Sequence, residues 1–307
     1  MNKSMKIVRG ALALALLGLT AAPLQAQLPT HLRDYPLAAP KAKGDLVAPM
    51  FNGWIANEDG STTYVFGFVN KNRTEIVDIP IGPNNHIEPA QFNGGQTTHF
   101  PAYSRGGFVG LQERGTFAVT VPADMKRTEV VWTLTHAGQT WSVPARATSP
   151  AYEMSRAPAA LGSLQPAIRF DLNGPESTDR QGVYASRITT SVGKPVTLSA
   201  YIQDRGERDK YEAEAVYPLG TEWILHQGPA TPRIEMAKIT GRERGAGAGE
   251  GDATSTNGWF EVKTQATFPV PGDYVVRLRV DNFEAQDSQF DNQCCWSNAY
   301  VPVTVTQ

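Results

Sequence analysis

Apolar residues recur at every second position in run after run of this sequence, and this period constrains the fold more than any other feature. In the run at residues 274–280, the residues between the apolar ones include Arg277 and Arg279, which predicts that this face of the strand is polar and points toward solvent. A period of two turns alternate side chains to opposite faces of a β-strand, so each run can bury one face. We therefore expect an all-β chain. The runs are residues 64–68, 77–81, 117–121, 130–134, 274–280 and 295–305.

Short turn sequences join some of these runs into hairpins. Asp59-Gly60 separates residues 51–55 from the 64–68 run, and a His-Ala-Gly-Gln turn at residues 136–139 follows the 130–134 run. Glycine accepts the positive φ angles that tight hairpin turns need. We predict a β-hairpin at each place.

The N-terminus has the three parts of an export signal. Lys3, Lys6 and Arg9 precede a short Ala/Leu run, and a small residue, Ala26, ends the segment. The apolar run is too short to span a bilayer, and this order of parts is typical of a cleaved signal peptide. We predict cleavage after Ala26 and a periplasmic or secreted chain with no transmembrane segment in its mature form.

The remaining chain is long enough for two domains. Cleavage leaves 281 residues, and a Pro-, Ala- and Ser-containing stretch divides them near the middle. The predicted parts are a signal peptide (1–26), an extended leader (27–46), an N-terminal β-sandwich-like domain (47–148), a linker (149–163) and a C-terminal β-sandwich domain (164–307).

Two segments of the C-terminal half carry a resemblance to a known class of fold. Residues 271–278 (Pro-Gly-Asp-Tyr-Val-Val-Arg-Leu) place Tyr274 at the start of a strand after a glycine turn, and residues 193–198 (Gly-Lys-Pro-Val-Thr-Leu) match an early strand. Both resemble immunoglobulin-like and polycystic-kidney-disease (PKD) type β-sandwiches, in which such a tyrosine hydrogen-bonds back across the corner. The resemblance implies Ig-like or PKD-like sandwiches in tandem. It implies no activity, because this architecture carries many functions.

The first half adds a second resemblance. Its segments Phe51-Asn52-Gly53-Trp54 and Val65-Phe66-Gly67-Phe68 are similar to those of secreted bacterial proteins. This similarity covers the two-part arrangement and implies no activity either.

Charge and cysteine content exclude several classes of protein. The chain has 28 basic and 30 acidic residues, so binding of nucleic acid through bulk positive charge is excluded. Loss of the signal peptide changes the net charge from −2 to −5, because that segment carries three cations and no anions. The 2 cysteines are neighbours and cannot close a long loop on each other, so no disulfide framework holds the fold.

Cys294 and Cys295, followed by Trp296, are nevertheless the rarest local feature and the first redox or ligand candidates. A trans peptide would hold their Cα atoms about 3.8 Å apart, below the usual disulfide minimum of about 4.4 Å. Four interpretations stay open. They are a redox switch, a soft-metal site, a strained ring at a ligand surface, and a buried thiol beside an incidental or intermolecularly bridged one.

The loop before these cysteines is rich in oxygen ligands. Asp281, Asp287 and Asp291 could hold Ca²⁺, a cation that prefers such oxygen ligands. Their spacing differs from that of the twelve-residue calcium loop, and an ordinary solvated loop is the alternative.

Residues 82–107, rich in Gly, Asn and Pro, predict a long surface connection and a natural place for a binding loop. His86, Glu88 and His99 fall in this stretch and are the binding-loop candidates. A copper or zinc site there and ordinary surface histidines are the two alternatives. Aromatic residues of the first half, such as Trp54 and Tyr64, could either stack on sugars or fill the core.

The sequence has no GxSxG elbow, P-loop or Ser/Lys motif, which favours a non-catalytic protein. The leading hypothesis is a secreted or periplasmic binding or protein-interaction module of the cell envelope, with an envelope protein or a glycan as its partner. One alternative is a metal- or redox-linked envelope protein that uses Cys294 and Cys295. The other is a carbohydrate-binding or polysaccharide-acting protein.

Overall fold

Strands make up nearly all of the regular structure in the described residues, which confirms the all-β prediction. The structure is a computed structural model that describes residues 41–102, 112–211, 217, 219–234, 258–288 and 294–307. The predicted signal peptide, residues 1–26, lies outside this part. Within it, no helix has the length and apolar character of a membrane span.

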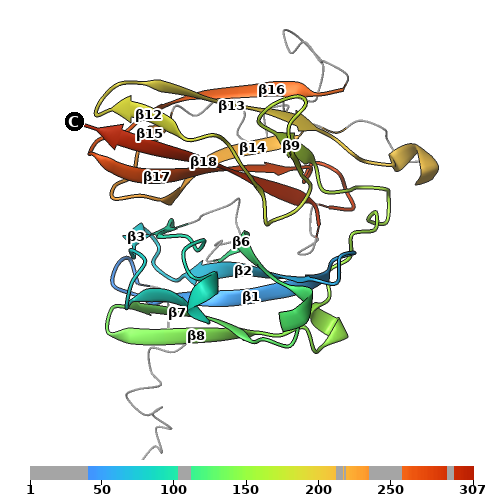
Figure 1. Cartoon of the computed structure of the whole chain (residues 1–307), viewed down its shortest axis with the longest axis horizontal. Helices are drawn as coiled ribbons and strands as arrows, with labels where there is room; N and C mark the ends of the chain where they lie inside the picture. Colours follow the sequence, from blue (N-terminus) through green and yellow to red (C-terminus); the bar gives the residue numbers. More distant parts are fainter. Residues whose placement is uncertain (1–40, 103–111, 212–216, 218, 235–257, 289–293) are drawn as a thin grey trace, which may run out of the picture. The chain divides into compact units, whose positions relative to one another are not determined.

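The N-terminal half forms two three-stranded sheets, ordered β1-β2-β6 and β4-β7-β8, and a short pair, β3-β5 (Figure 1). Its strands are β1 (Val47–Ala56), β2 (Thr62–Asn70), β3 (Val77–Asp78), β4 (Asn85–Glu88), β5 (His99–Phe100), β6 (Gln112–Val121), β7 (Val130–His136) and β8 (Gln139–Ala145). Its 3-10 turns are η2 (Ala90–Phe92), η3 (Ala123–Met125) and η4 (Pro150–Tyr152).

Both predicted hairpins are present. β1 and β2 pair antiparallel with Trp54 opposite Tyr64. β7 and β8 pair with His136 opposite Gln139, and the two residues between them, Ala137 and Gly138, have φ angles of 50° and 74°. These left-handed values give the turn the twist that a two-residue hairpin needs.

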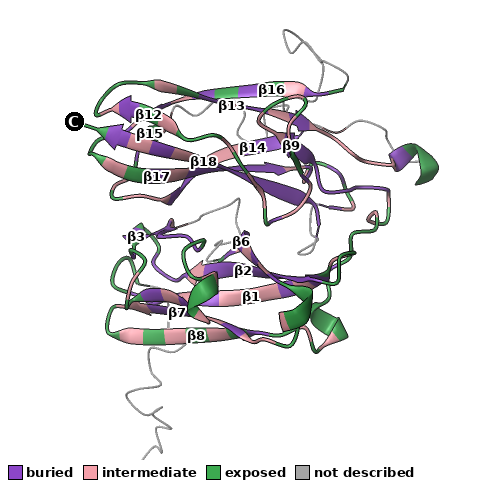
Figure 2. Cartoon of the chain, in the orientation of Figure 1, coloured by how far each residue is buried: buried purple, intermediate pink, exposed green. Residues whose placement is uncertain are grey.

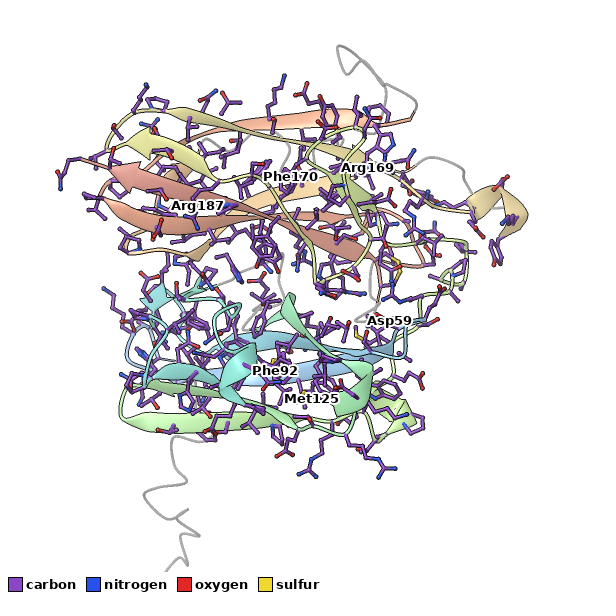
Figure 3. The ribbon with its side chains drawn as sticks, viewed as in Figure 1. Asp59, Phe92, Met125, Arg169, Phe170 and Arg187 are labelled. Carbon is purple, nitrogen blue, oxygen red and sulfur yellow. A yellow bond between two sulfur atoms is a disulfide. The ribbon has the colours of Figure 1, made fainter. Side chains whose placement is uncertain are left out.

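Aromatic side chains fill the space between the two N-terminal sheets. Trp132 of β7 is fully buried and meets Phe117 of β6 edge-on, with ring centroids 4.9 Å apart. Phe66 stacks on Phe117 at 5.3 Å. Phe92 of η2 and Met125 of η3 pack against the same cluster (Figure 3). The period-two aromatics therefore fill the core.

The C-terminal half is a sandwich of two larger sheets, ordered β10-β9-β13-β16-β15 and β11-β18-β17-β14, with β12 also paired to β18. Its strands are β9 (Ala167–Arg169), β10 (Glu176–Ser177), β11 (Val183–Tyr184), β12 (Ile188–Ser191), β13 (Val196–Gln203), β14 (Gly220–Gln227), β15 (Arg233–Ile234), β16 (Phe260–Thr267), β17 (Gly272–Asp281) and β18 (Trp296–Thr306), and its 3-10 turn is η5 (Arg208–Tyr211). The tandem β-sandwich fold is thus present.

The corner tyrosine of the Ig-like resemblance behaves as that resemblance implies. Tyr274 is fully buried at the start of β17, and its hydroxyl donates to the carbonyl of Val270 at 2.8 Å. Gly272, with a φ of 142°, turns the chain into the strand. Phe170 packs against both apolar clusters of this sandwich (Figure 3).

The prediction that the polar face of β17 points toward solvent is wrong. Arg277 and Arg279 are only 1% and 6% exposed. On β18 the residues from Trp296 to Val301 are all buried, whichever face they belong to (Figure 2). This sheet is covered on both sides here because residues of β6 lie against its second face, as their hydrogen bonds show. Residues Lys41–Gln307 accordingly form one compact unit.

Candidate functional site

A β-bulge in β6 begins the contact between the two sandwiches. Phe66 of β2 pairs with Phe117, and Phe68 pairs with Glu113, so three residues of β6 oppose Gly67 alone. A Cβ on Gly67 would lie 2.2 Å from the Glu113 carbonyl oxygen, so only glycine fits here. A bulge disrupts the ladder locally and leaves backbone groups unpaired. The carbonyl groups of β6 at the bulge are therefore available to other donors.

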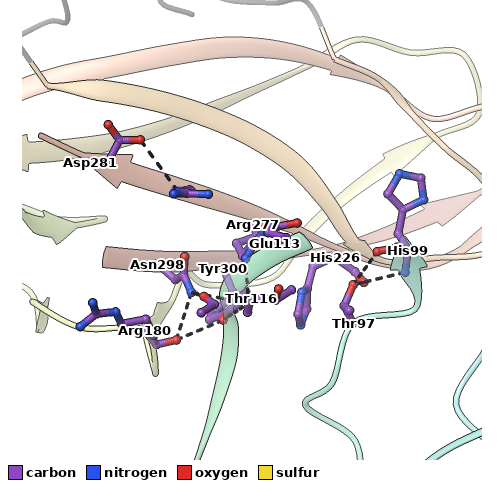
Figure 4. Close-up of polar contacts among 12 residues, drawn as sticks. Thr97, His99, Glu113, Thr116, Arg180, His226, Arg277, Asp281, Asn298 and Tyr300 are labelled. Atoms are coloured by element: carbon purple, nitrogen blue, oxygen red, sulfur yellow. Dashed lines mark hydrogen bonds and ion pairs between the residues drawn. The ribbon is translucent and has the colours of Figure 1, made fainter. Parts of the chain in front are cut away.

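Side chains of β17 and β18 supply those donors. Arg277 Nη1 donates to the Thr116 carbonyl at 2.9 Å, and Asn298 Nδ2 donates to the Gly115 carbonyl at 2.8 Å. The hydroxyl of Tyr300 donates to the Thr116 carbonyl at 3.3 Å. We call this buried group the polar junction (Figure 4). It comprises Glu113, Thr116, Arg180, His226, Arg277, Asn298 and Tyr300.

A buried ion pair lies at the centre of the polar junction. Arg277 Nη2 contacts Glu113 Oε1, and the two side chains are 1% and 2% exposed. Two buried charges stabilise a fold only when each satisfies the other, because both have lost their hydration. The pair therefore fixes the position of β6 relative to β17 and gives the contact its specificity.

His226 extends the junction to the edge of the second sheet. It sits in a bulge of β14, where the register shifts between Leu225 and Gln227. Its carbonyl accepts from Thr98 N at 2.8 Å and from Thr97 Oγ1 at 2.9 Å, and its Nε2 lies 2.9 Å from the Gly95 carbonyl. Residues 95–98 thus cover the end of β14, which would otherwise be an exposed sheet edge.

Burial determines the charge states in this region. It lowers the pKa of His226 to about 3, and the neighbouring Arg277 charge acts in the same direction. The imidazole is therefore neutral at physiological pH. Burial also raises the pKa of Tyr300, so its hydroxyl stays protonated and can donate.

The junction is polar without being fully satisfied. Thr116 Oγ1 and Asn298 Oδ1 are buried with no hydrogen-bond partner among the described residues, and the same holds for the Oγ of Ser297, the residue before Asn298. Buried polar atoms in this state make a contact less stable than an apolar one of equal area. The junction therefore adds specificity with little net stability.

Trp296, a candidate from the sequence, belongs to this region. Its ring packs against Gly115 so closely that a Cβ there would lie 2.5 Å from Trp296 Cζ2. The guanidinium groups of Arg180 and Arg279 lie 4.2 and 5.2 Å from the ring centroid. Cations over an indole face gain cation–π attraction, which is larger when the groups are buried. Trp296 thus joins β18 to the bulge of β6.

The other two candidates, Cys294 and Cys295, form a disulfide with each other. The peptide between them is cis, with the Cα atoms 3.1 Å apart, so the trans spacing considered from the sequence does not apply. The interpretation as one buried thiol and one incidental thiol is therefore wrong, and so is the start of the last strand at Cys295. β18 begins at Trp296.

The predicted calcium ligands point to different partners. Asp287 accepts from Leu161 N and Ser163 N at 2.8 and 3.1 Å and from Ser163 Oγ at 2.5 Å. Asp281 lies 3.9 Å from Arg279 Nε. Asp291 lies outside the described residues. Within the described part of the chain, no three His, Cys, Asp or Glu side chains form a group that could hold a metal ion. Calcium binding stays a prediction.

Residues 82–107 differ from the surface connection that the sequence predicted. The part described, up to residue 102, contains β4 and β5, and Asn85 and Gln96 are fully buried in it. Asn85 Nδ2 donates to two backbone carbonyls, those of Ile79 and Thr97, and its Oδ1 accepts from Trp132 Nε1 at 3.0 Å. Amide side chains therefore take the place of apolar ones in this segment, and composition alone does not reveal that.

The binding-loop candidates are divided between two strands. His86 and Glu88 lie on β4, and Glu88 is exposed. His99 lies on β5, is 5% exposed, and its Nδ1 is 2.7 Å from Asp78 Oδ1. His99 thus has a carboxylate partner within the fold. Their role in binding stays a prediction.

Sequence reasoning missed Glu113, Thr116 and Asn298 of the junction. Glu113 lies in no recognisable motif, and Asn298 looks like a polar residue at an exposed strand position. The usable signal was Gly67 and Gly115, since a glycine inside a strand marks a bulge or a close approach of another chain segment.

No protein-family model and no curated protein matches this chain. Similar solved structures include domains 4 and 5 of the S-layer protein SbsC, at 10% identity and a TM-score of 0.22, covering 59% of this chain and 66% of that one. A titin fragment covers 85% of this chain and 100% of its own at 11% identity and a TM-score of 0.21. A mutant of the enterotoxigenic E. coli adhesin CfaE covers 89% of each chain at 8% identity and a TM-score of 0.26.

This chain thus spans just under two thirds of the SbsC fragment. TM-scores of 0.21 to 0.26 are too low to carry an argument about fold or function. The assignment of two sandwiches comes from the sheets themselves.

Proposed function

We propose that this protein is a non-catalytic protein-binding module of the cell envelope, exported by the segment 1–26 and active in the periplasm or outside the cell. The observation that carries the proposal is a pair of exposed tyrosines, each packed on another aromatic ring. Tyr152 is 52% exposed, and its ring centroid lies 5.8 Å from that of Phe51. Tyr184 is 55% exposed and stacks on the buried Tyr300 at 4.8 Å.

A tyrosine side chain that already packs on another aromatic ring loses little conformational freedom when a partner protein covers its exposed face. Tyrosine combines a large apolar area with a hydroxyl that can hydrogen-bond, and it is enriched in protein interfaces together with arginine. Arginines accompany both tyrosines in sequence. Arg156 and Arg187 have side chains that are 48% and 51% exposed, and Arg187 is labelled in Figure 3. These features favour a protein partner over a glycan.

The ionisable groups described above support the non-catalytic part of the proposal. Glu113 pairs with Arg277, His99 with Asp78, and Asp287 with the backbone of residues 161–163. A catalytic acid or base must reach a substrate in a cleft, at hydrogen-bond distance. These groups instead hold one chain segment to another.

The test compares the chain with its Tyr152→Ser/Tyr184→Ser variant. Proteins captured from envelope extract by the immobilised chain are identified by mass spectrometry, and the purified partner is then titrated against both forms. We expect Kd to rise at least about tenfold, since aromatic anchors dominate such interfaces. Tyr211→Ser, which changes a tyrosine of η5 that is 45% exposed, should leave Kd unchanged.

Two results would overturn the proposal. One is an unchanged set of captured proteins with the double variant. The other is tyrosine-dependent binding on a glycan array without a protein partner, which would establish the carbohydrate-binding alternative instead.

A further inference from the structure

The Cys294–Cys295 disulfide lies where separate segments of the chain meet. Cys294 Sγ lies 3.9 Å from the Ser163 carbonyl oxygen, and Asn282 N donates to the Cys295 carbonyl at 3.3 Å. Cys294 is 6% exposed and Cys295 is fully buried. In thiol–disulfide exchange an attacking thiolate must reach one of the two sulfur atoms. The packed segments 161–165 and 282–288 therefore shield the disulfide from a reductant.

One carboxylate fixes these two segments to each other. Asp287 lies in the second segment, and its oxygens accept from Leu161 N and from the backbone and hydroxyl of Ser163 in the first. Asn282 adds a second connection, since its Nδ2 donates to the Leu164 carbonyl at 2.9 Å. We call segments 161–165 and 282–288 together the cover of the disulfide. The cover opens only when these hydrogen bonds break together.

The disulfide is also continuous with the polar junction. Trp296 follows Cys295 directly and packs on Gly115 in the bulge of β6. Two residues later, Asn298 donates to the carbonyl of the same glycine. A change in the backbone at residues 294–295 therefore moves the side chains that hold β18 to β6.

We propose that Cys294–Cys295 is a reducible clasp of the polar junction, which a dithiol reduces when segments 161–165 and 282–288 separate. Oxidised, the clasp keeps Trp296 against Gly115. Reduced, the two side chains are no longer joined, the cover packs less tightly, and β6 dissociates more readily from β17 and β18. The clasp acts whatever the binding partner is, so it goes beyond the proposed function.

The exchange is a two-electron reaction in two steps. A thiolate of the dithiol attacks one cysteine sulfur, forms a mixed disulfide, and breaks the Cys294–Cys295 bond, so that the other cysteine leaves as a thiolate and takes a proton from water. The second thiol of the donor then loses its proton to water and attacks the donor sulfur of the mixed disulfide, which breaks the bond to the cysteine. That cysteine leaves as a thiolate and takes a proton from water, so the donor is oxidised to its own disulfide and both cysteines remain as thiols.

The rate of reduction by dithiothreitol tests the cover. Samples are quenched in acid, unfolded and alkylated, and the mass of the chain then counts its free thiols. We expect reduction of the native chain to be at least about tenfold slower than reduction in urea, because only open forms react. Equal rates would contradict the shielding, and this comparison needs no variant.

A matched pair of variants tests the role of the carboxylate. Asp287→Ala should speed reduction several-fold. Asp59→Ala is the control, because Asp59 also accepts from the backbone and hydroxyl of a serine, Ser61, but in a turn of the N-terminal sandwich. Its reduction rate should equal that of the unmodified chain. Equal rates for both variants would overturn the assignment of the cover.

Hydrogen exchange tests the connection to the junction. After reduction and alkylation of the native chain, or in the Cys294→Ser/Cys295→Ser variant, we expect faster amide exchange in β6 and in residues 161–165. Exchange in β7, within the N-terminal core, should be unchanged. If exchange in β6 is the same in the oxidised and reduced forms, the disulfide is not a clasp of the junction.

Discussion

The N-terminal core and the polar junction are both buried, but different forces hold them. In the core, rings such as Phe66, Phe117 and Trp132 pack without regard to direction, and their contribution grows with the apolar area removed from water. In the junction, Glu113 and Arg277 must meet donor to acceptor, and some buried oxygens there have no partner among the described residues. The core supplies stability, whereas the junction supplies a specific arrangement of β6 against β17 and β18.

The largest expected effect is in the core. Trp132→Ala removes a fully buried indole between Phe100 and Phe117 and the donor to Asn85 Oδ1. Truncation of such a residue leaves a cavity, and we expect the free energy of unfolding to fall by about 4 kcal/mol. Urea unfolding followed by circular dichroism measures it. Trp141→Ala, at a half-buried position of β8, should cost less than half as much. Equal losses would mean that the core is not the main source of stability.

The next effect separates charge from packing in the junction. Arg277→Met leaves the Glu113 carboxylate buried beside an apolar chain, and we expect a loss of about 3 kcal/mol in the free energy of unfolding. The double variant Arg277→Met/Glu113→Gln should recover at least about 1 kcal/mol of this loss, because no unpaired charge is then buried.

The exposed pair Arg187 and Asp273 provides the control for that substitution. Their side chains are 51% and 74% exposed, with Arg187 Nη1 2.8 Å from Asp273 Oδ1. Arg187→Met should cost less than about 0.5 kcal/mol, because solvent screens an exposed pair. If the double variant at the junction is no more stable than Arg277→Met alone, the ion pair does not have the role assigned to it.

A smaller effect isolates the close contact of β6 with Trp296. Gly115 has a φ of 58° and no room for a Cβ, whereas Gly193 has a φ of 72° and nothing within 4 Å of a built Cβ. Gly193→Ala should cost about 1 kcal/mol from the backbone alone, and Gly115→Ala about 2 kcal/mol in all, because the clash adds about 1 kcal/mol. Urea midpoints measure both. A similar cost at the two positions would show that Trp296 yields without strain.

The same contrast explains how much could be predicted from the sequence. The hairpin at Asp59-Gly60 and the corner at Tyr274 depend on neighbours in the chain, so their local signals sufficed. Arg277 and Arg279 show the opposite case. Their alternation with Val276 and Leu278 indicates a polar face correctly. Contact with β6, about 160 residues away in the chain, buries Arg277, and Arg279 lies against the rings of Phe283 and Trp296.

The candidate sites show the same limit. Cys294 and Cys295 are unusual in the sequence because they are adjacent, but adjacency alone does not show whether they pair with each other, and the structure joins them in a disulfide. In residues 82–107 the polar residues looked like those of a surface loop. Asn85 and Gln96 are polar because they satisfy buried backbone groups 6 to 12 residues away in the chain, and the composition of the segment does not show that these groups are buried.

The last comparison concerns the pH dependence of the junction. His226 is neutral in the fold, where burial, the Arg277 charge and the nearby His99 lower its pKa, although Glu113 acts in the opposite direction. Its folded pKa is about 3, below the ordinary value of about 6.5, so only the unfolded chain takes up a proton between these values. Stability therefore falls as pH falls from about 6.5 to 3, by at most about 1.4 kcal/mol per pH unit from this group.

His226→Gln keeps a donor for the Gly95 carbonyl and removes the titration. The variant should lose less stability than the unmodified chain between pH 6.5 and 4, as urea unfolding at each pH measures. Thr97→Val removes a hydrogen bond to the backbone of the same residue without a change in charge. Its loss should therefore be equal at both pH values, because an uncharged donor contributes independently of pH. If His226→Gln retains the full pH slope, the acid sensitivity arises from carboxylates elsewhere, and the junction owes none of it to the buried imidazole.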